Sequence, residues 1–166
     1  NLKLRTVSRN GSDIKLDLTH FDELKGLLSQ LKPTHIINCA ADLSSNQGAQ
    51  SLSSWQLNVE LINVLASYCS LSDCRLLHYS TDQYYPVGEH NLHTEVEKIH
   101  LNTLYALQKY CSEQVALLSP ESLILRTSFL GLSRGPRQNL LDWFVEELQT
   151  KNATMMTHKY VPLKSS

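Results

Sequence analysis

The chain alternates short apolar, often β-branched runs with longer segments whose apolar residues recur every three or four positions. The short runs are typical of buried strands, and the longer segments predict amphipathic helices. The pattern predicts strands at 2–7, 35–40, 75–79 and 122–127, and helices at 21–31, 52–70, 101–118 and 140–148. Alternating strands and helices predict an α/β fold: one parallel sheet with helices on both faces, joined by right-handed crossovers.

Two of the predicted helices carry more detailed expectations. Thr19 is a candidate N-cap for the helix at 21–31, with Asp22 three residues later, and Pro33 would end that helix. In the helix at 101–118, one face carries the apolar residues and is expected to form the core stripe: Leu104, Leu107, Cys111, Val115 and Leu118.

Composition narrows the class of protein. The 166 residues carry 15 Lys and Arg against 16 Asp and Glu, a net charge of −1, and 42% are hydrophobic, which fits one soluble domain. The absence of a basic run argues against nucleic-acid binding, and no apolar run approaches the ~20 residues of a membrane-spanning helix. The four cysteines form no CxxC pair, so we expect no metal site or disulfide framework, and a cytoplasmic protein with reduced thiols.

The ends of the chain do not resemble the ends of a domain. A strand-like run starts at Leu2, and another begins at Tyr160 shortly before Ser166. We therefore expect a segment of a longer polypeptide, in which residues 1–150 form a cofactor-binding and catalytic core and 151–166 begin a substrate-binding lobe.

Polar residues follow three of the predicted strands. They occupy positions 38–41, 80–82 and 126–128. Ligands of open parallel sheets gather at the carboxyl ends of the strands, so these three groups are expected at one site. Any one of these groups taken alone would fit a turn or a helix cap better than a site.

Tyr105 and Lys109 lie one turn apart on a flank of the predicted helix at 101–118. A tyrosine with a pKa near 10 is a poor acid, and a nearby ammonium group lowers that pKa. Such a pair can donate a proton to a carbonyl oxygen whose carbon receives hydride. Taken alone, the same spacing also fits two residues on a solvent-exposed helix.

Several longer motifs accompany this pair. They read KPTHIINCAA (32–41), LNV (57–59), HYSTDQYYPVG (78–88), Glu95 and Glu97, YALQK (105–109) followed by Glu113, and LILRTSFLG (123–131). Their order and gaps resemble the extended short-chain dehydrogenase/reductase family, most closely its dTDP-4-dehydrorhamnose reductase branch. The resemblance implies a doubly wound, Rossmann-like α/β fold and a reductase of a 4-keto-deoxysugar nucleotide.

The resemblance also implies roles for single residues. Tyr105 would donate the proton, Thr81 would hydrogen-bond the substrate carbonyl, and Lys109 would lower the pKa of Tyr105 and hold the nicotinamide ribose. Asp82 would join Thr81 and Tyr105 on the sugar side, and Glu95 would shape that pocket or its loop. The cofactor, NADP or NAD, would also contact Arg9, Asp17, Leu18, Asn38, Ala40 and Ala41. No metal ion is implied, and a homodimer is the candidate assembly.

Departures from the family pattern keep alternatives open. The first strand and the glycine-rich loop that holds the pyrophosphate have no counterpart in the chain. Ala106 and Leu101 replace a usual Gly and Pro, and residues 83–86 differ from the usual sequence. A non-catalytic scaffolding relative or a nucleotide-sugar epimerase therefore remains an alternative. A dehydratase is disfavoured because Gln83 stands where such enzymes place a glutamate, and an amide cannot transfer a proton at neutral pH.

Overall fold

The computed structural model describes residues 3–43, 52–85, 93–128 and 145. The elements follow the chain in this order: β1 Val7–Ser8, β2 Ile14–Lys15, α1 Phe21–Leu31, β3 His35–Asn38, α2 Leu52–Trp55, η2 Gln56–Glu60, α3 Leu61–Ser70, β4 Arg75–Tyr79, α4 Leu104–Ala116 and β5 Ser122–Leu125. The predicted helix at 140–148, apart from residue 145, and the predicted lobe at 151–166 lie outside the described residues.

Every strand pair in the described residues is parallel, as the alternating pattern predicts. β1 pairs with β2, and a three-stranded sheet has the order β3-β4-β5. In that sheet Asn38 lies opposite His78, and His78 lies opposite Ile124. The carboxyl ends of the three strands therefore meet at one edge, which brings the polar residues that follow them together.

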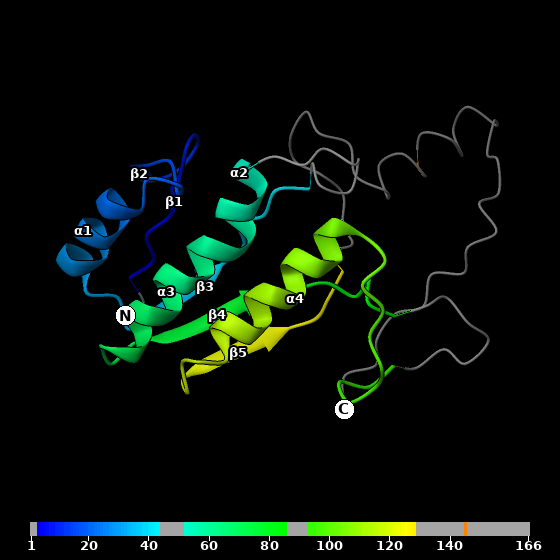
Figure 1. Cartoon of the computed structure of the whole chain (residues 1–166). Helices are drawn as coiled ribbons and strands as arrows, with labels where there is room; N and C mark the ends of the chain where they lie inside the picture. Colours follow the sequence, from blue (N-terminus) through cyan, green and yellow to red (C-terminus); the bar gives the residue numbers. More distant parts are fainter. Residues whose placement is uncertain (1–2, 44–51, 86–92, 129–144, 146–166) are drawn as a thin grey trace.

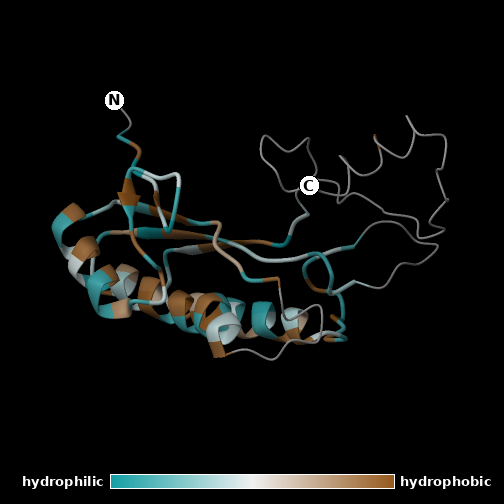
Figure 2. Cartoon of the chain, turned by 90° about the horizontal axis from the view of Figure 1, so that it is seen from above, coloured by the Kyte–Doolittle hydropathy of each residue, from teal (hydrophilic) through white to brown (hydrophobic). Residues whose placement is uncertain are grey.

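Helices α3 and α4 run side by side along one face of the three-stranded sheet (Figures 1 and 2). The core beneath α3 includes Ile62, Leu65 and Leu76, all at most 5% exposed. On the opposite face, Ile37, Leu77 and Leu123 form one row across the strands, and Ile37 and Leu123 are more than half exposed. We expected helices on both faces; α3 and α4 in the described ranges share one.

The core stripe predicted for α4 is wrong. Leu107 and Leu118 are exposed, and Leu104, Cys111 and Val115 are only partly buried. The inward side is mainly polar instead, and its buried residues are Tyr105, Ala106, Gln108, Lys109, Ser112, Glu113 and Ala116. A polar helix face can be buried when its groups find hydrogen-bond partners, and partners are present on η2, on β4 and at Arg126, the residue after β5.

Several element boundaries also differ from the predictions. The strand at 75–79 is confirmed, whereas the strands at 35–40 and 122–127 end earlier and β2 was not predicted. The helix at 52–70 contains the π-helical segment η2. Thr19 does not cap α1: its N–H and hydroxyl both donate to the Asp17 carboxylate, and His20 occupies the cap position. The corresponding cap of α4 is Thr103, whose hydroxyl oxygen accepts the N–H of Ala106.

Candidate active site

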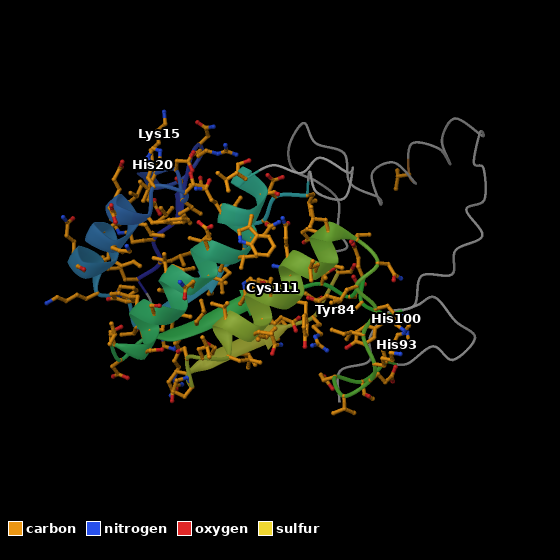
Figure 3. The ribbon with its side chains drawn as sticks, in the orientation of Figure 1. Lys15, His20, Tyr84, His93, His100 and Cys111 are labelled. Carbon is orange, nitrogen blue, oxygen red and sulfur yellow. The ribbon has the colours of Figure 1, made fainter. Side chains whose placement is uncertain are left out.

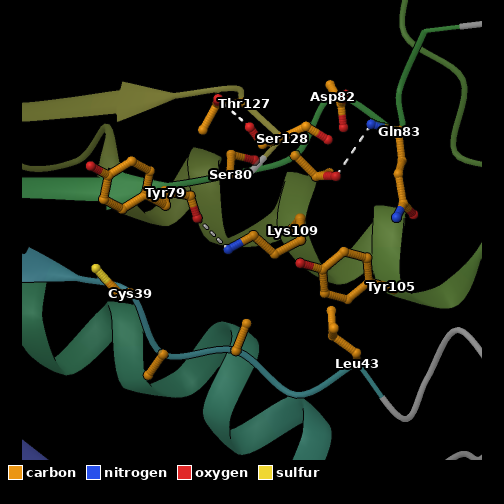
Figure 4. A pocket seen from close by; sticks show the side chains of 13 residues that line it. Cys39, Leu43, Tyr79, Ser80, Asp82, Gln83, Tyr105, Lys109, Thr127 and Ser128 are labelled. Atoms are coloured by element: carbon orange, nitrogen blue, oxygen red, sulfur yellow. Dashed lines mark hydrogen bonds between the residues drawn. The ribbon is translucent and has the colours of Figure 1, made fainter. Parts of the chain in front are cut away.

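A pocket of about 310 Å³ opens at the carboxyl ends of the three strands (Figure 4). It brings together all three residues predicted to be catalytic, Thr81, Tyr105 and Lys109. The complete lining is Cys39, Ala40, Ala41, Leu43, Tyr79, Ser80, Thr81, Asp82, Gln83, Tyr105, Lys109, Thr127 and Ser128. Residues of all three predicted groups therefore share one site, although Asn38 and Arg126 of those groups do not line it.

Lys109 reaches the pocket from α4 and is only 2% exposed. Its Nζ donates to the carbonyl oxygen of Tyr79 at 2.6 Å and lies 3.3 Å from Nε2 of His78 (Figure 4). Burial lowers the pKa of Lys109 to about 8, although the nearby Glu113 carboxylate acts in the opposite direction.

Tyr105 lies beside Lys109 in the pocket and is 7% exposed. We expected Lys109 to lower its pKa, and the structure corrects this expectation. The pKa of Tyr105 is raised, first because burial disfavours the phenolate and second because the Asp82 carboxylate repels it. The Lys109 ammonium group is held instead at the Tyr79 carbonyl. Tyr105 therefore keeps its proton at neutral pH, which is the form that a proton donor needs.

Thr81 and Asp82 begin a tight turn directly after β4. The Thr81 hydroxyl oxygen accepts the N–H of Gln83 at 3.2 Å, so its own proton remains to be donated to another acceptor. The Tyr85 N–H closes the turn on the Asp82 carbonyl at 3.1 Å. This turn places Thr81, Asp82 and Gln83 on the pocket wall.

Four residues predicted to bind the cofactor do not line the pocket. Arg9 follows β1, and Asp17 lies shortly after β2. Hydrogen bonds from Thr19 lower the pKa of Asp17, and the charge of Arg9 adds a smaller effect in the same direction. Leu18 packs against the hydrophobic core. Asn38 is 5% exposed, and its Nδ2 faces Nδ1 of His78 at 3.1 Å. Only Ala40 and Ala41 of this set are pocket residues besides Tyr105 and Lys109.

A buried amide network that the sequence analysis missed holds the wall opposite Tyr105. The Asn58 side chain accepts from the N–H of Asp42 and donates to its carbonyl, both at 2.8 Å. Asn58 also donates to Gln108 at 2.7 Å, and Gln108 donates to Ser54. The segment after β3 is thus tied to η2 and α4. Isolated amides at helical positions have no spacing signal that would have revealed this network.

A second missed cluster anchors the segment between β4 and α4. Arg126 makes a bidentate ion pair with Glu113, which is 2% exposed, and donates to the Tyr85 hydroxyl and to the Glu95 carbonyl. Its guanidinium group lies 5.2 Å from the centre of the Tyr84 ring. The His100 N–H donates to the Tyr84 carbonyl (Figure 3), and the His93 ring stacks on the ring of Tyr85. Tyr84 and Tyr85, which depart from the usual family sequence, therefore help to hold the segment between β4 and α4 in place. Glu95 belongs to that segment and does not line the pocket.

Other classes of site find no support in the described part of the chain. No group of three or more His, Cys, Asp or Glu residues there could hold a metal ion. The four cysteines are free thiols, and burial raises the pKa of Cys69 to about 12. Among the described helices, none has the length and apolar character required to cross a lipid bilayer.

The lowered pKa of Lys109 predicts a pH-dependent stability. Between pH 8 and 10.5 the unfolded chain keeps the Lys109 proton that the folded chain has lost, so the free energy of unfolding should rise with pH. Lys109→Met should remove roughly 2 to 3 kcal/mol of this rise. Urea unfolding at several pH values measures the difference. Lys25→Met, on the exposed side of α1, is the control for loss of one lysine; equal slopes in the wild type and Lys109→Met would contradict the assignment.

Comparisons with known proteins agree with this geometry. The sequence pattern of the NAD dependent epimerase/dehydratase family matches residues 3–129. The dTDP-4-dehydrorhamnose reductase of Aggregatibacter actinomycetemcomitans is 34% identical over 117 residues, which are 69% of this chain and 40% of that protein. The crystal structure of a hypothetical dTDP-4-dehydrorhamnose reductase from Sulfolobus tokodaii is 30% identical, with a TM-score of 0.65 over 76% of this chain and 47% of that one.

A third solved structure is similar to this chain in fold. The Bacillus anthracis dTDP-4-dehydrorhamnose reductase, crystallised in complex with NADP, has a TM-score of 0.70 at 22% identity and covers 84% of this chain and 49% of that one. These structures confirm the Rossmann-like α/β fold. The chain spans about half the length of these relatives or less. Because the family pattern matches more than half of its residues, the chain belongs to the NAD dependent epimerase/dehydratase family.

Proposed function

We propose that the protein containing this chain reduces a 4-keto-deoxysugar nucleotide with NADPH or NADH, as a reductase of the dTDP-4-dehydrorhamnose type. The observation that carries the proposal is that Thr81, Tyr105 and Lys109 line one pocket at the carboxyl ends of parallel strands. The similarity to curated and solved dTDP-4-dehydrorhamnose reductases supports the choice of substrate class.

The pocket residues suit a nicotinamide dinucleotide. Ala40 and Ala41 have small side chains on the wall opposite α4, so a flat ring can approach the backbone there. The Lys109 ammonium group uses one donor on Tyr79, which leaves two for ribose hydroxyls. Bound there, the cofactor would supply hydride. Arg9 and Asp17, beside β1 and β2, would contact its adenine end, and Arg9 would favour the extra phosphate of NADP.

The chain's own residues then handle the proton and the carbonyl oxygen. Thr81 would donate a hydrogen bond to the ketone oxygen and thereby polarise it. As the carbon gains hydride, the oxygen gains negative charge, and Tyr105 would transfer its proton to it. The ketone becomes an alcohol, and the Tyr105 phenolate that is left takes a proton back from water, since burial and the Asp82 carboxylate disfavour the phenolate. Asp82 lies where it would contact the sugar.

The proposal includes a cellular location and an oligomeric state. The free state of all four cysteines supports a reducing, cytoplasmic location. The proposed assembly is a homodimer, which sedimentation of the full-length protein would test. The buried polar pocket speaks against a scaffolding relative, because a scaffold has no need for a desolvated lysine.

An assay of the full-length protein with dTDP-4-dehydrorhamnose tests the proposal. We expect consumption of NADPH or NADH that depends on the sugar nucleotide, with one product alcohol formed per cofactor oxidised. Nicotinamide absorbance measures the first quantity, and chromatography of the nucleotide sugars measures the second. Inversion of a sugar centre without net cofactor oxidation would identify an epimerase instead, and no conversion of any kind would favour the scaffolding alternative.

A further inference from the structure

His78 lies immediately behind the pocket without lining it. It belongs to β4, is 0% exposed, and lies opposite Asn38 of β3 and Ile124 of β5. Because it is absent from the pocket wall, it cannot touch a substrate. Its ring nevertheless contacts three polar side chains, those of Asn38, Ser112 and Lys109.

The hydrogen bonds around His78 determine which of its two ring nitrogens carries the proton. The N–H of Ala40 donates to Oδ1 of Asn38 at 3.3 Å, which turns the Asn38 Nδ2 toward His78. Nδ2 can only donate, so Nδ1 of His78 accepts and the imidazole proton lies on Nε2. Nε2–H then donates to the Ser112 hydroxyl at 2.9 Å, and Ser112 donates to the Lys109 carbonyl at 2.6 Å.

His78 is held in its neutral form. Burial, and next the positive charge of Lys109, lower its pKa to about 3. A second proton on the ring would also remove the acceptor that Asn38 uses. His78 therefore does not carry protons at neutral pH, and its contribution is geometric.

We propose that His78 is a positioning residue, which fixes Lys109 in the pocket by linking the Asn38-Ala40 turn to the Lys109 turn of α4 through Ser112. This inference rests on the proposed function, because it concerns the same site. The Ser112 hydroxyl holds the Lys109 backbone carbonyl, whereas the imidazole Nε2–H, 3.3 Å from Nζ, makes no hydrogen bond to it and limits the position of the ammonium group by packing. The chain of bonds joins the loop predicted to bind the cofactor to the helix that carries Tyr105 and Lys109.

Two substitutions of His78 each preserve one of the two hydrogen bonds that its imidazole makes. His78→Gln can place an amide N–H near the position of Nε2 and so keep the bond to Ser112. His78→Asn is too short to do so, but it can keep an acceptor for Asn38. We expect His78→Asn to lower kcat by at least ~10-fold and to raise KM for NADPH, because a displaced lysine misplaces the reacting groups. His78→Gln should stay within about threefold of the wild type for both constants.

A control variant in β4 shows whether a lower kcat comes from lost stability or from a displaced Lys109. Leu76→Ala removes a fully buried side chain from β4 on the same face as His78, without contact to the pocket. It should lower Tm while leaving kcat unchanged well below Tm. If His78→Asn lowers Tm but keeps the wild-type kcat and KM, or if His78→Gln and His78→Asn lose activity equally, the positioning role is wrong.

The pKa of Lys109 tests the positioning role of His78 without an activity assay, and so independently of the proposed reductase function. NMR titration of the Lys109 side chain gives its pKa in the 166-residue chain. In His78→Asn we expect that pKa to rise from about 8 toward the ordinary 10.5, because water reaches Nζ. The other groups near Nζ, namely Glu113, Tyr105, Tyr79, Asp82 and Cys39, are unchanged in both variants. An unaltered pKa in His78→Asn would overturn the proposal, even if the wild type is an active reductase.

Discussion

Replacing Tyr105 by phenylalanine is expected to lower kcat of the full-length protein by at least ~10², with little change in the affinity for NADPH. The substitution removes only the hydroxyl, so the ring keeps its place between Lys109 and the segment after β3. Without the phenol, protonation of the developing alkoxide depends on water in a pocket whose Tyr105 and Lys109 are less than 10% exposed. Steady-state kinetics and fluorescence titration with NADPH measure the two quantities separately.

Tyr110→Phe is the matched control for that experiment. Tyr110 lies on the same helix, outside the pocket, and its ring packs edge-on against Tyr84. Loss of its hydroxyl should leave kcat near the wild-type value. Equal turnover in Tyr105→Phe and the wild type would remove Tyr105 from the mechanism, whereas loss of NADPH binding in Tyr105→Phe would assign it to the cofactor alone.

Arg126→Met is expected to lower the free energy of unfolding by about 3 to 5 kcal/mol. The substitution leaves the buried Glu113 carboxylate without its bidentate partner. It also removes the donor to the Tyr85 hydroxyl and the cation above the Tyr84 ring. Urea unfolding followed by circular dichroism measures the loss.

Two further variants show whether the unpaired charge causes that loss. Arg75 and Glu121 form an ion pair in which both side chains are more than half exposed, so Arg75→Met should cost less than about 1 kcal/mol. In the double variant Arg126→Met/Glu113→Leu the buried charge is gone, and most of the stability should return. If the double variant is as unstable as Arg126→Met, packing around Tyr84, not the lone carboxylate, causes the loss.

The strand and helix order could be predicted from the sequence because it depends on local periodicity. The strand at 75–79 is confirmed to the residue, and parallel pairing followed from the alternation. β2 was not predicted because two residues are too short for a recognisable pattern. The shared location of Thr81, Tyr105 and Lys109 was predicted from strand ends and motif spacing, and the pocket contains all three.

The contacts behind the pocket could not be predicted in the same way. The Asn58-Gln108 and Asn38-His78 bonds join residues 50 and 40 positions apart, and they depend on the register between elements. The inward face of α4 was misassigned because hydropathy assumes that the buried side of a helix is its apolar side. That assumption fails where a helix buries satisfied polar groups around a site.

The polar inner face of α4 has a consequence for protein engineering. Replacing Lys109, the member of that face that lines the pocket, by an aliphatic residue of similar length would remove the desolvation cost of a buried ammonium group. A selection for thermal tolerance alone would therefore favour variants with a filled pocket and no chemistry. Safer positions for such a selection are on the outer side of the same helix, where Leu107 already meets solvent.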